Sequence, residues 1–497
     1  MIHQRDANGF TPFYAVSNLK KFTDAAAAVD YICQLYDENI AKIREAFGHF
    51  LEDQNKDNFP KTQEANYPFL GIKVGRKELN LDGRLAYGVV SEPGIYGGTL
   101  TRPDLFKAYY TEQIALLIER HQVPVFVGNS SWPIPLPFAI DSSSEFKSTK
   151  TIDLGELWQT ESGFILPNLA NIDDDIANCS HKPQGMIKPI SIFTGERVDY
   201  SLHRLHHYTA TIPEHFQGFI LLTNYQRYAD EFIKFSLDTI KKDKEYTELI
   251  LPGGISCKTE KDIPATLSLP QMPAYHLKRK DGMGITFINI GVGPSNAKNI
   301  TDHLAVLRPH CWLMVGHCAG LRQTQILGDY VLAHGYVRDD HVLDNDLPIW
   351  VPVPPIAEVQ VALQQAAENI GKKKGREVKH SMRTGTVIST DDRNWELRTK
   401  KLYEEFRMSR AIALDMESAT IAANGFRFRV PYGTLLCVSD KPIHGELKLR
   451  GMANQFYRDR VTQHLQVGLE TVRILRENGV DNLHSRKLRG FDEPPFR

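Results

Sequence analysis

The sequence has little of what secreted, metal-binding or membrane proteins need. Its 497 residues include only 6 cysteines, which are scattered at Cys33, Cys179, Cys257, Cys311, Cys318 and Cys437. They lack metal-site spacing and are typical of reduced thiols in a cytosolic protein. No apolar run approaches the roughly 20 residues needed to cross a bilayer. The opening MIHQRDANGFTPF has no apolar signal core either, so we expect a cytoplasmic protein.

The chain also lacks an excess of either charge. Its 59 Lys and Arg residues nearly balance its 60 Asp and Glu residues, for a net charge of -1. A dedicated nucleic-acid binder would show a clear basic excess, so we expect no nucleic acid and no membrane as partner. Because 497 residues exceed one ordinary core, we expect two or three domains.

The patterns of apolar residues divide the chain in two. Residues 1–180 combine a long helical pattern over 18–52 with a strand over 67–74 and a helix that starts at Pro103. This predicts an N-terminal α+β domain, with a boundary placed to within roughly 20 residues. From 181 to 497, strands alternate with helices, which predicts a mainly parallel sheet with helices on both faces.

The stretch Ala411–Pro442 reads as strand, short helix and strand. Asp415 is a suitable cap for the helix, and Asn424-Gly425 is a suitable end for it. Glu417 at the helix start and Asp440 after the last strand are two acids that can face one pocket, because ligands bind at the carboxyl ends of strands in open α/β sheets. Read alone, however, Asp440 is also a turn former and Glu417 a first-turn acid.

Two Gly-rich turns follow other predicted strands. The turn GVGPSN contains Gly293, and the turn GHCAG contains Gly316 and His317. Small residues let a ligand approach the backbone closely, although neither turn matches a dinucleotide or Walker sequence. His317 is either a ligand-binding group or a buried, hydrogen-bonded imidazole.

These elements occur in an order that resembles the nucleoside phosphorylase/nucleosidase superfamily. Its marks are GVGPSNAKNITDHL, GHCAGLRQTQILGDYVLA, RTGTVIST, DMESATIA and LCVSDKP, within residues 210–475. The resemblance implies a nucleoside-phosphorylase-like α/β catalytic domain over 181–497, with a mixed, mainly parallel central sheet flanked by helices. LDGRLAYG, TRPDLF and SDKPIHGELKLRGMANQFY are similar to the branch that hydrolyses AMP to adenine and ribose 5-phosphate.

The resemblance also implies roles for single residues. Asp440 matches the acid that protonates purine N7, and we expect either that burial raises its pKa or that substrate N7 shares its proton. Glu417 matches the acceptor for the ribose 2′- and 3′-hydroxyls, whose charge also favours a sugar cation. Met416 matches a residue packed under the sugar, and Trp395 lies near the position that stacks on the base.

The phosphate contacts differ from those of phosphorylases. Their Gly-Asp-x-x-Arg sequence is replaced here by Asn224-Tyr225-Gln226-Arg227-Tyr228, which suits a hydrolase with water as nucleophile. A monophosphate still needs cations, and Arg is the preferred one. The candidates are Arg227, His207, Arg383, Lys441 and Lys448. With Ser439, Gly293, Gly316 and His317 they complete the predicted substrate site.

The resemblance further implies a homohexamer in which a neighbouring subunit completes the site near His207. It implies no cofactor or metal for the chemistry, MgATP as an allosteric activator and phosphate as an inhibitor. Regulatory contacts are expected near Arg84, Arg102 and Asn129 of the N-terminal domain. Two alternatives stay open: a phosphorylase or hydrolase of unphosphorylated nucleosides, and a catalytically silent nucleotide sensor.

Overall fold

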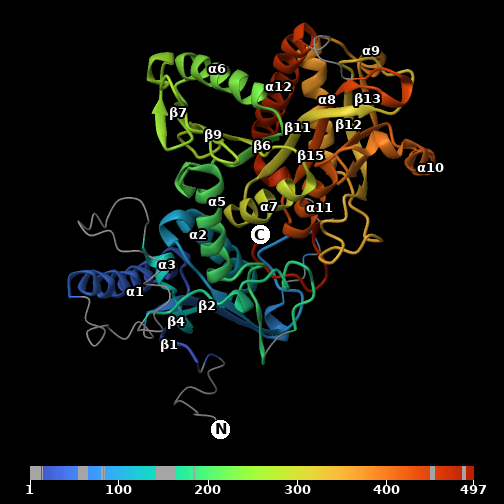
Figure 1. The fold of residues 1–497 in the computed structure, drawn as a ribbon. Helices are drawn as coiled ribbons and strands as arrows, with labels where there is room; N and C mark the ends of the chain where they lie inside the picture. Colours follow the sequence, from blue (N-terminus) through green and yellow to red (C-terminus); the bar gives the residue numbers. More distant parts are fainter. Residues whose placement is uncertain are drawn as a thin grey trace. The chain divides into compact units, whose positions relative to one another are not determined.

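The chain folds as two units. The computed structural model describes residues 13, 15–53, 65–79, 82, 84–140, 164–182, 185–447, 454–483 and 488–497 (Figure 1). The first unit comprises 1–203 with 490–497, and the second comprises 204–489. The division falls within helix α5 (Gly195–Thr209). A regulatory or oligomerisation role for the N-terminal domain stays a prediction.

A five-stranded sheet organises the first unit, in the order β1-β4-β2-β3-β5. The pairing of β3 with β5 is parallel and the others are antiparallel. Its strands are β1 (Ser17–Phe22), β2 (Asn66–Val74), β3 (Gly94–Thr99), β4 (Val125–Pro133) and β5 (Ile187–Pro189). Its other helices are α1 (Ala25–Asp53), α2 (Pro103–His121) and the short α3 (Leu136–Ala139).

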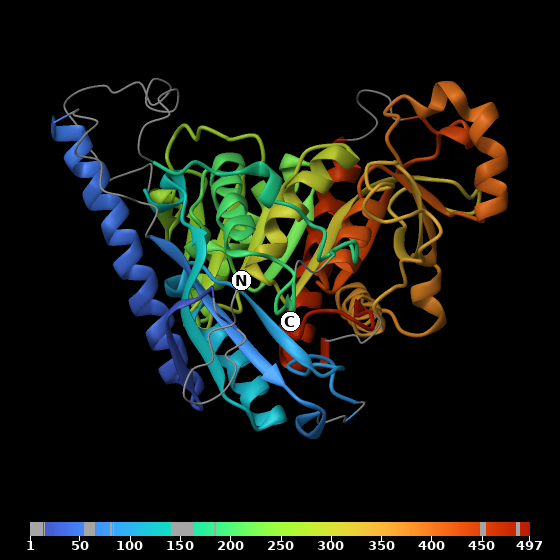
Figure 2. The ribbon, with the colours of Figure 1, turned by 90° about the horizontal axis from the view of Figure 1, so that it is seen from below.

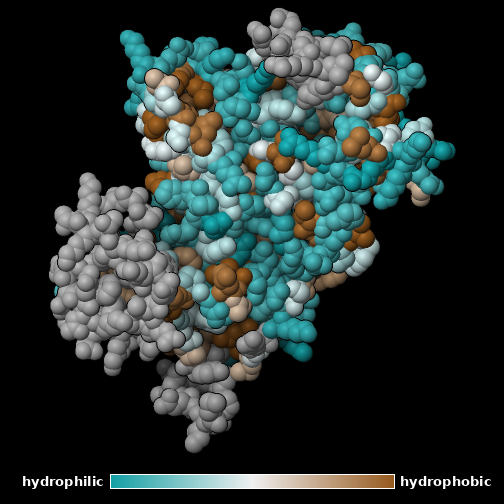
Figure 3. All heavy atoms as spheres, viewed as in Figure 1, coloured by the Kyte–Doolittle hydropathy of each residue, from teal (hydrophilic) through white to brown (hydrophobic). Residues whose placement is uncertain are grey.

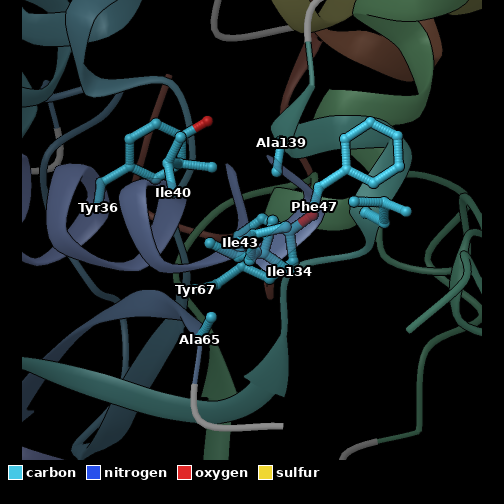
Figure 4. Close-up of a cluster of buried hydrophobic side chains, with 9 residues drawn as sticks. Tyr36, Ile40, Ile43, Phe47, Ala65, Tyr67, Ile134 and Ala139 are labelled. Carbon is cyan, nitrogen blue, oxygen red and sulfur yellow. The ribbon is translucent and has the colours of Figure 1, made fainter. Parts of the chain in front are cut away.

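Helix α1 packs one face into the core of this unit (Figure 4). Tyr36, Ile40, Ile43 and Phe47 recur three or four residues apart, which places them on one side of the helix. They form a buried cluster with Tyr67 of β2 and other apolar residues. The predicted helical pattern over 18–52 is therefore right for α1 but wrong for its first residues, which form the exposed edge strand β1.

A ten-stranded mixed sheet organises the second unit, in the order β14-β13-β12-β15-β11-β6-β10-β9-β7-β8. The strands are β6 (Phe219–Thr223), β7 (Tyr246–Leu251), β8 (Ile255–Cys257), β9 (Ala274–Arg279), β10 (Ile285–Asn289), β11 (Cys311–Gly320), β12 (Tyr330–Asp339), β13 (Met382–Thr390), β14 (Ala413–Asp415) and β15 (Tyr432–Asp440). The run β15-β11-β6-β10 is parallel, so these strands end at one edge. β14 also pairs with β11, which closes β11–β15 into a ring.

Helices cover both faces of β15. A Cβ at Gly425 of α11 would contact the Tyr432 ring, so Tyr432 packs on α11. A Cβ at the next strand residue, Gly433, would contact side chains of α8. Successive strand residues point to opposite faces, so α8 and α11 lie on opposite sides of the sheet. The helices are α6 (Gln226–Lys242), α7 (Pro294–Leu304), α8 (Ala357–Gly371), α9 (Arg376–Lys379), α10 (Thr399–Ser409), α11 (Ser418–Phe428) and α12 (Asn454–Glu477) (Figure 2).

The predicted end of α11 at Asn424-Gly425 is wrong. The helix continues to Phe428 and ends at Arg429, whose φ is 59°. Gly425 instead provides space, because a Cβ there would lie 2.3 Å from Tyr432 Cδ1.

Hydrophilic side chains cover most of the described face that Figure 3 shows, with hydrophobic ones in scattered groups. Within the described ranges, no helix combines the length and hydropathy that a membrane span requires.

Candidate active site

The turn between β14 and α11 is fixed by a buried carboxylate. Asp415 Oδ2 accepts hydrogen bonds from the Ser418 backbone N–H at 3.0 Å and from the Ser418 hydroxyl. Its Oδ1 accepts from the Ser389 hydroxyl of β13 at 2.5 Å. Asp415 thus accepts the first N–H of α11, as predicted, although the N-cap position itself is Glu417, and it holds the next residues of the turn in place.

The Glu417 carboxylate is fully buried and held at both oxygens. Its Oε1 accepts the Gly293 N–H at 2.6 Å, and its Oε2 accepts from Asn224 Nδ2 at 3.0 Å. Gly293 has a φ of 121°, which glycine adopts far more readily than other residues. The turn GVGPSN therefore serves to present a backbone N–H to Glu417, and the structure brings these two predicted residues together.

The surroundings of these acids disfavour their charged forms. Burial raises the pKa of Glu417, and the negative charge of Asp415 raises it further. Burial likewise raises the pKa of Asp415, against the hydrogen bonds from Ser389 and Ser418. A site with these properties has a low dielectric, in which a positive charge that develops on a substrate interacts strongly with a carboxylate.

Asp440 is the last residue of β15 and is half-buried. The Ser439 hydroxyl donates to Asp440 Oδ1 at 2.6 Å, and the Ser439 Oγ also lies 3.3 Å from the Cys318 carbonyl oxygen. The register between β11 and β15 shifts at this point, so that Asp440 pairs with Ala319. Asp440 therefore lies beside the segment GHCAG, which forms the end of strand β11 and not the predicted turn, and the residues from Leu435 to Val438 before Asp440 are buried.

His317 belongs to a buried chain of hydrogen bonds that the sequence did not reveal. His464 Nε2 lies 3.0 Å from the Leu435 carbonyl, to which it must donate. Its Nδ1 then accepts from the Tyr228 hydroxyl at 2.7 Å, and the Tyr228 oxygen accepts from His317 Nε2 at 3.2 Å. This order predicts that His317 carries a proton at Nε2, and burial lowers the pKa of His464 to about 3.

The ends of β6 and β11 bring further groups to this region. The Tyr225 ring centre lies 4.6 Å from that of His317. A Cβ at Gly316 would lie 3.1 Å from Asn224 Oδ1, so the glycine allows this approach. Met416 is partly buried between the two fixed acids of its turn.

Other predicted residues have different surroundings. Trp395 is buried in an apolar cluster and meets Phe406 edge-on, with ring centres 5.9 Å apart, which favours packing over base stacking. Lys441 is buried in an ion pair with Glu446 at 2.6 Å, so the structure does not present it as a phosphate ligand. Arg383 donates to the Thr324 carbonyl at 2.7 Å.

Two more phosphate candidates are exposed. Arg227 lies in the first turn of α6, and His207 lies near the end of α5 with its ring against Tyr208. Lys448 lies outside the described residues.

The sequence missed Asn224, Tyr228 and His464 as parts of the site. The replacement of the phosphorylase Gly-Asp sequence indicated that Asn224 differs from its counterpart in phosphorylases. The sequence of α12 gave no indication that His464 belongs to the site. Asp415 was recognised only as a helix cap. Among the residues that the structure describes, no three His, Cys, Asp or Glu side chains lie together in a group that could hold a metal ion.

Two family models match the chain. Residues 27–187 match "Bacterial AMP nucleoside phosphorylase N-terminus", and residues 272–473 match "Phosphorylase superfamily". AMP nucleosidase of Escherichia coli K12 is 48% identical over 481 residues, which cover 95% of this chain and 98% of the relative. Guanosine phosphorylase of Halorubrum lacusprofundi is 21% identical over 198 residues, covering 39% of this chain and 78% of the relative.

Solved structures cover about half of the chain. AMP nucleosidase from Bacteroides thetaiotaomicron is 29% identical, with a TM-score of 0.43, and covers 56% of this chain and 98% of its own. Purine nucleoside phosphorylase from Toxoplasma gondii is 16% identical, with a TM-score of 0.41, and covers 55% of this chain and 98% of its own.

Proposed function

The chain belongs to the AMP nucleosidase family, and we propose how its residues perform the reaction of that family. The reaction hydrolyses the N-glycosidic bond of AMP to adenine and ribose 5-phosphate. The observation that carries the proposal is the buried Glu417 carboxylate, which the Gly293 N–H and the Asn224 amide hold at the carboxyl ends of the strands.

Glu417 holds the ribose. An ionised carboxylate only accepts hydrogen bonds, so it is suited to the 2′- and 3′-hydroxyls. As the bond to adenine breaks, the sugar gains oxocarbenium character. The negative charge of Glu417 stabilises that cation strongly, because burial keeps water away from both. Met416, in the same turn, packs under the sugar.

Asp440 acts as the general acid. Adenine is a poor leaving group as an anion, and protonation at N7 lets it leave neutral. The Ser439 hydroxyl donates to Asp440 Oδ1 and so orients the carboxyl group. Because Oδ1 accepts this hydrogen bond, Oδ2 is the oxygen that donates the proton to N7. General acid catalysis of this kind contributes about 10²–10⁴ in rate.

Recognition of the 5′-phosphate falls to the remaining cations. Arg227 is our first choice, because it is exposed and lies three residues after Asn224. Arg383 and His207 are the other candidates, with His207 reaching the site of a neighbouring subunit in a homohexamer. Lys441 is a weaker candidate, because its side chain is buried and already bound to Glu446 and to the Gln325 carbonyl.

Regulation is assigned to the N-terminal domain of a cytoplasmic enzyme, with MgATP as activator and phosphate as inhibitor. Arg102 lies at the start of α2 and pairs with Asp104 at 2.8 Å, and Arg84 pairs with Asp82 at the same distance. Phosphate oxygens can replace the carboxylate partners of such arginines. Asn129 is less accessible, because it is buried and its Oδ1 accepts from Asn39.

Substrate comparison tests this function. We expect AMP to yield adenine and ribose 5-phosphate without added phosphate, and adenosine to be turned over far more slowly. Products are separated and quantified by chromatography. Equal turnover of adenosine would favour a nucleoside enzyme, a requirement for phosphate would favour a phosphorylase, and no release of adenine would favour a nucleotide sensor.

A further inference from the structure

The Asn224 carboxamide stands at the carboxyl end of β6, where it begins the connection to α6. Its Nδ2 donates to Glu417 Oε2 at 3.0 Å. In the ionised form of Glu417 that the proposed function requires, this contact fixes which way the amide points, because an ionised carboxylate accepts hydrogen bonds and cannot pair with the amide oxygen.

The oxygen of this amide lacks a hydrogen-bond donor among the residues that the structure describes. Asn224 Oδ1 is buried and makes no hydrogen bond with any residue in the described ranges. It lies against the backbone of β11, since a Cβ at Gly316 would be 3.1 Å from it. Buried carbonyl oxygens are normally hydrogen-bonded, so this oxygen is suited to a donor that arrives with the substrate or as water.

The stereochemistry of AMP indicates which donor this is. Adenine lies on one face of the ribose ring, and the 2′- and 3′-hydroxyls lie on the opposite face. Water that displaces adenine attacks C1′ from the face opposite the base, which is the face of the hydroxyls. A side chain bound to the carboxylate that holds these hydroxyls therefore lies on the side of attack.

We propose that Asn224 is the positioning residue for the attacking water, whose hydrogen bond to Asn224 Oδ1 directs a lone pair of the water at C1′. This inference rests on the role proposed above for Glu417. The sugar cation is already electrophilic and needs an oriented nucleophile more than a strong base. A neutral amide meets that requirement, although it removes no proton.

The proposed step balances without another reactant. The water oxygen forms a bond to C1′ while the C1′–N9 bond breaks and its electron pair leaves with adenine. Asp440 donates a proton to N7. The attacking water releases one proton to bulk solvent, from which Asp440 is protonated again.

The test compares Asn224→Ala with the wild type in water and in water–methanol mixtures. Methanol is an alternative nucleophile that yields methyl ribofuranoside 5-phosphate in place of ribose 5-phosphate. We expect kcat to fall at least about tenfold while KM changes less than about threefold. We also expect the product ratio to shift toward the solvent composition, because the variant no longer selects water.

A matched control is Asn369→Ala. Asn369 also donates from Nδ2 to a glutamate, Glu470, at 2.7 Å, but on the exposed surface of α8. Its kinetics and product ratio should equal those of the wild type. The product ratio is also independent of the fraction of folded enzyme, so partial misfolding of Asn224→Ala does not obscure the result.

Two outcomes overturn the inference. An unchanged kcat and product ratio would show that Asn224 does not position water. A raised KM with unchanged kcat and ratio would assign Asn224 Oδ1 to a ribose hydroxyl instead. The variant Glu417→Gln distinguishes failure of the proposed function from failure of this inference. Normal kinetics of Glu417→Gln would refute the proposed function itself. Impaired kinetics of Glu417→Gln together with normal kinetics of Asn224→Ala would refute only the role of Asn224.

Discussion

At the scale of single residues, Glu417 shows how an ordinary helix-start acid becomes a reactive group. The protein buries it completely and supplies two N–H donors, from Gly293 and Asn224. Burial raises its pKa, so the unliganded protein favours the neutral form more than an exposed glutamate would. Hydroxyl donors of the ribose and a developing sugar cation then favour the ionised form.

Replacement of Glu417 by Gln should impair both binding and turnover. Glutamine keeps the shape but brings an NH₂ group toward donors that need an acceptor, and it removes the negative charge. We expect KM for AMP to rise and kcat to fall by about 10²-fold or more. Steady-state measurement of adenine release checks both constants, and unchanged values would remove Glu417 from the site.

The residue scale is also where prediction from the sequence was most uneven. Gly293 and Glu417 were both identified, but their direct contact was not, because their spacing along the chain says nothing about a hydrogen bond between them. Lys441 looked like a phosphate ligand because its ion pair with Glu446 depends on the local turn after β15. Asp440 and Glu417 stay predictions as catalytic residues.

At the scale of elements, close packing decides where α11 ends. The sequence predicts a helix end at Gly425, because Asn-Gly after a helical pattern usually terminates a helix. The structure uses Gly425 for contact between α11 and β15, a property of tertiary packing that local sequence does not report. In contrast, the buried strand over 432–438 was predictable and is confirmed as part of β15, because its apolar run is continuous.

Gly425→Ala should therefore destabilise the protein despite the better helix propensity of alanine. Its Cβ would lie 2.3 Å from Tyr432 Cδ1 and 2.8 Å from the Val430 carbonyl oxygen. Overpacking of this kind costs about 1–3 kcal/mol. Urea denaturation measures the change. Gly371→Ala is the matched control, because its Cβ meets nothing within 4 Å, and there we expect no loss.

The chain His464–Tyr228–His317 joins α12, α6 and β11. Tyr228→Phe removes the hydroxyl from between the two imidazoles. We expect a loss of about 1–3 kcal/mol in the free energy of unfolding, because buried polar atoms lose a partner. Thermal or urea denaturation provides the measurement, with the exposed Tyr403→Phe as control. Equal stability of the two variants would contradict the hydrogen-bond order given above.

At the scale of the whole molecule, the fold class was predictable because strands and helices alternate over most of the second unit. The ring formed by β11–β15 was not, because β14 has only three residues and pairs on both sides. The first unit was harder to read, since its edge strand β1 is mostly exposed and lacks an apolar pattern.

A buried acid in the first unit should make stability depend on pH. Asp199 of α5 accepts hydrogen bonds from Tyr67 and Thr101, and burial raises its pKa to about 7. In the unfolded chain an Asp titrates near 3.9. Between these values the folded protein binds one proton more than the unfolded chain, so Asp199 makes stability fall as pH rises.

Asp199→Asn should flatten this dependence. We expect the melting temperature of the wild type to decline more steeply than that of the variant between about pH 4 and pH 7. Calorimetry at several pH values checks this, with the exposed Asp238→Asn as reference. Parallel curves for the wild type and Asp199→Asn would show that Asp199 ionises normally in the folded protein.

The most direct test of the account is the rate of adenine release from AMP by Asp440→Asn. Asparagine preserves the size of the side chain and its place beside Ser439, but it carries no proton for N7. We predict that kcat falls at least about a hundredfold while AMP still binds, as measured by equilibrium binding. A variant that releases adenine at a near-normal kcat would contradict the account and show that another group is the acid.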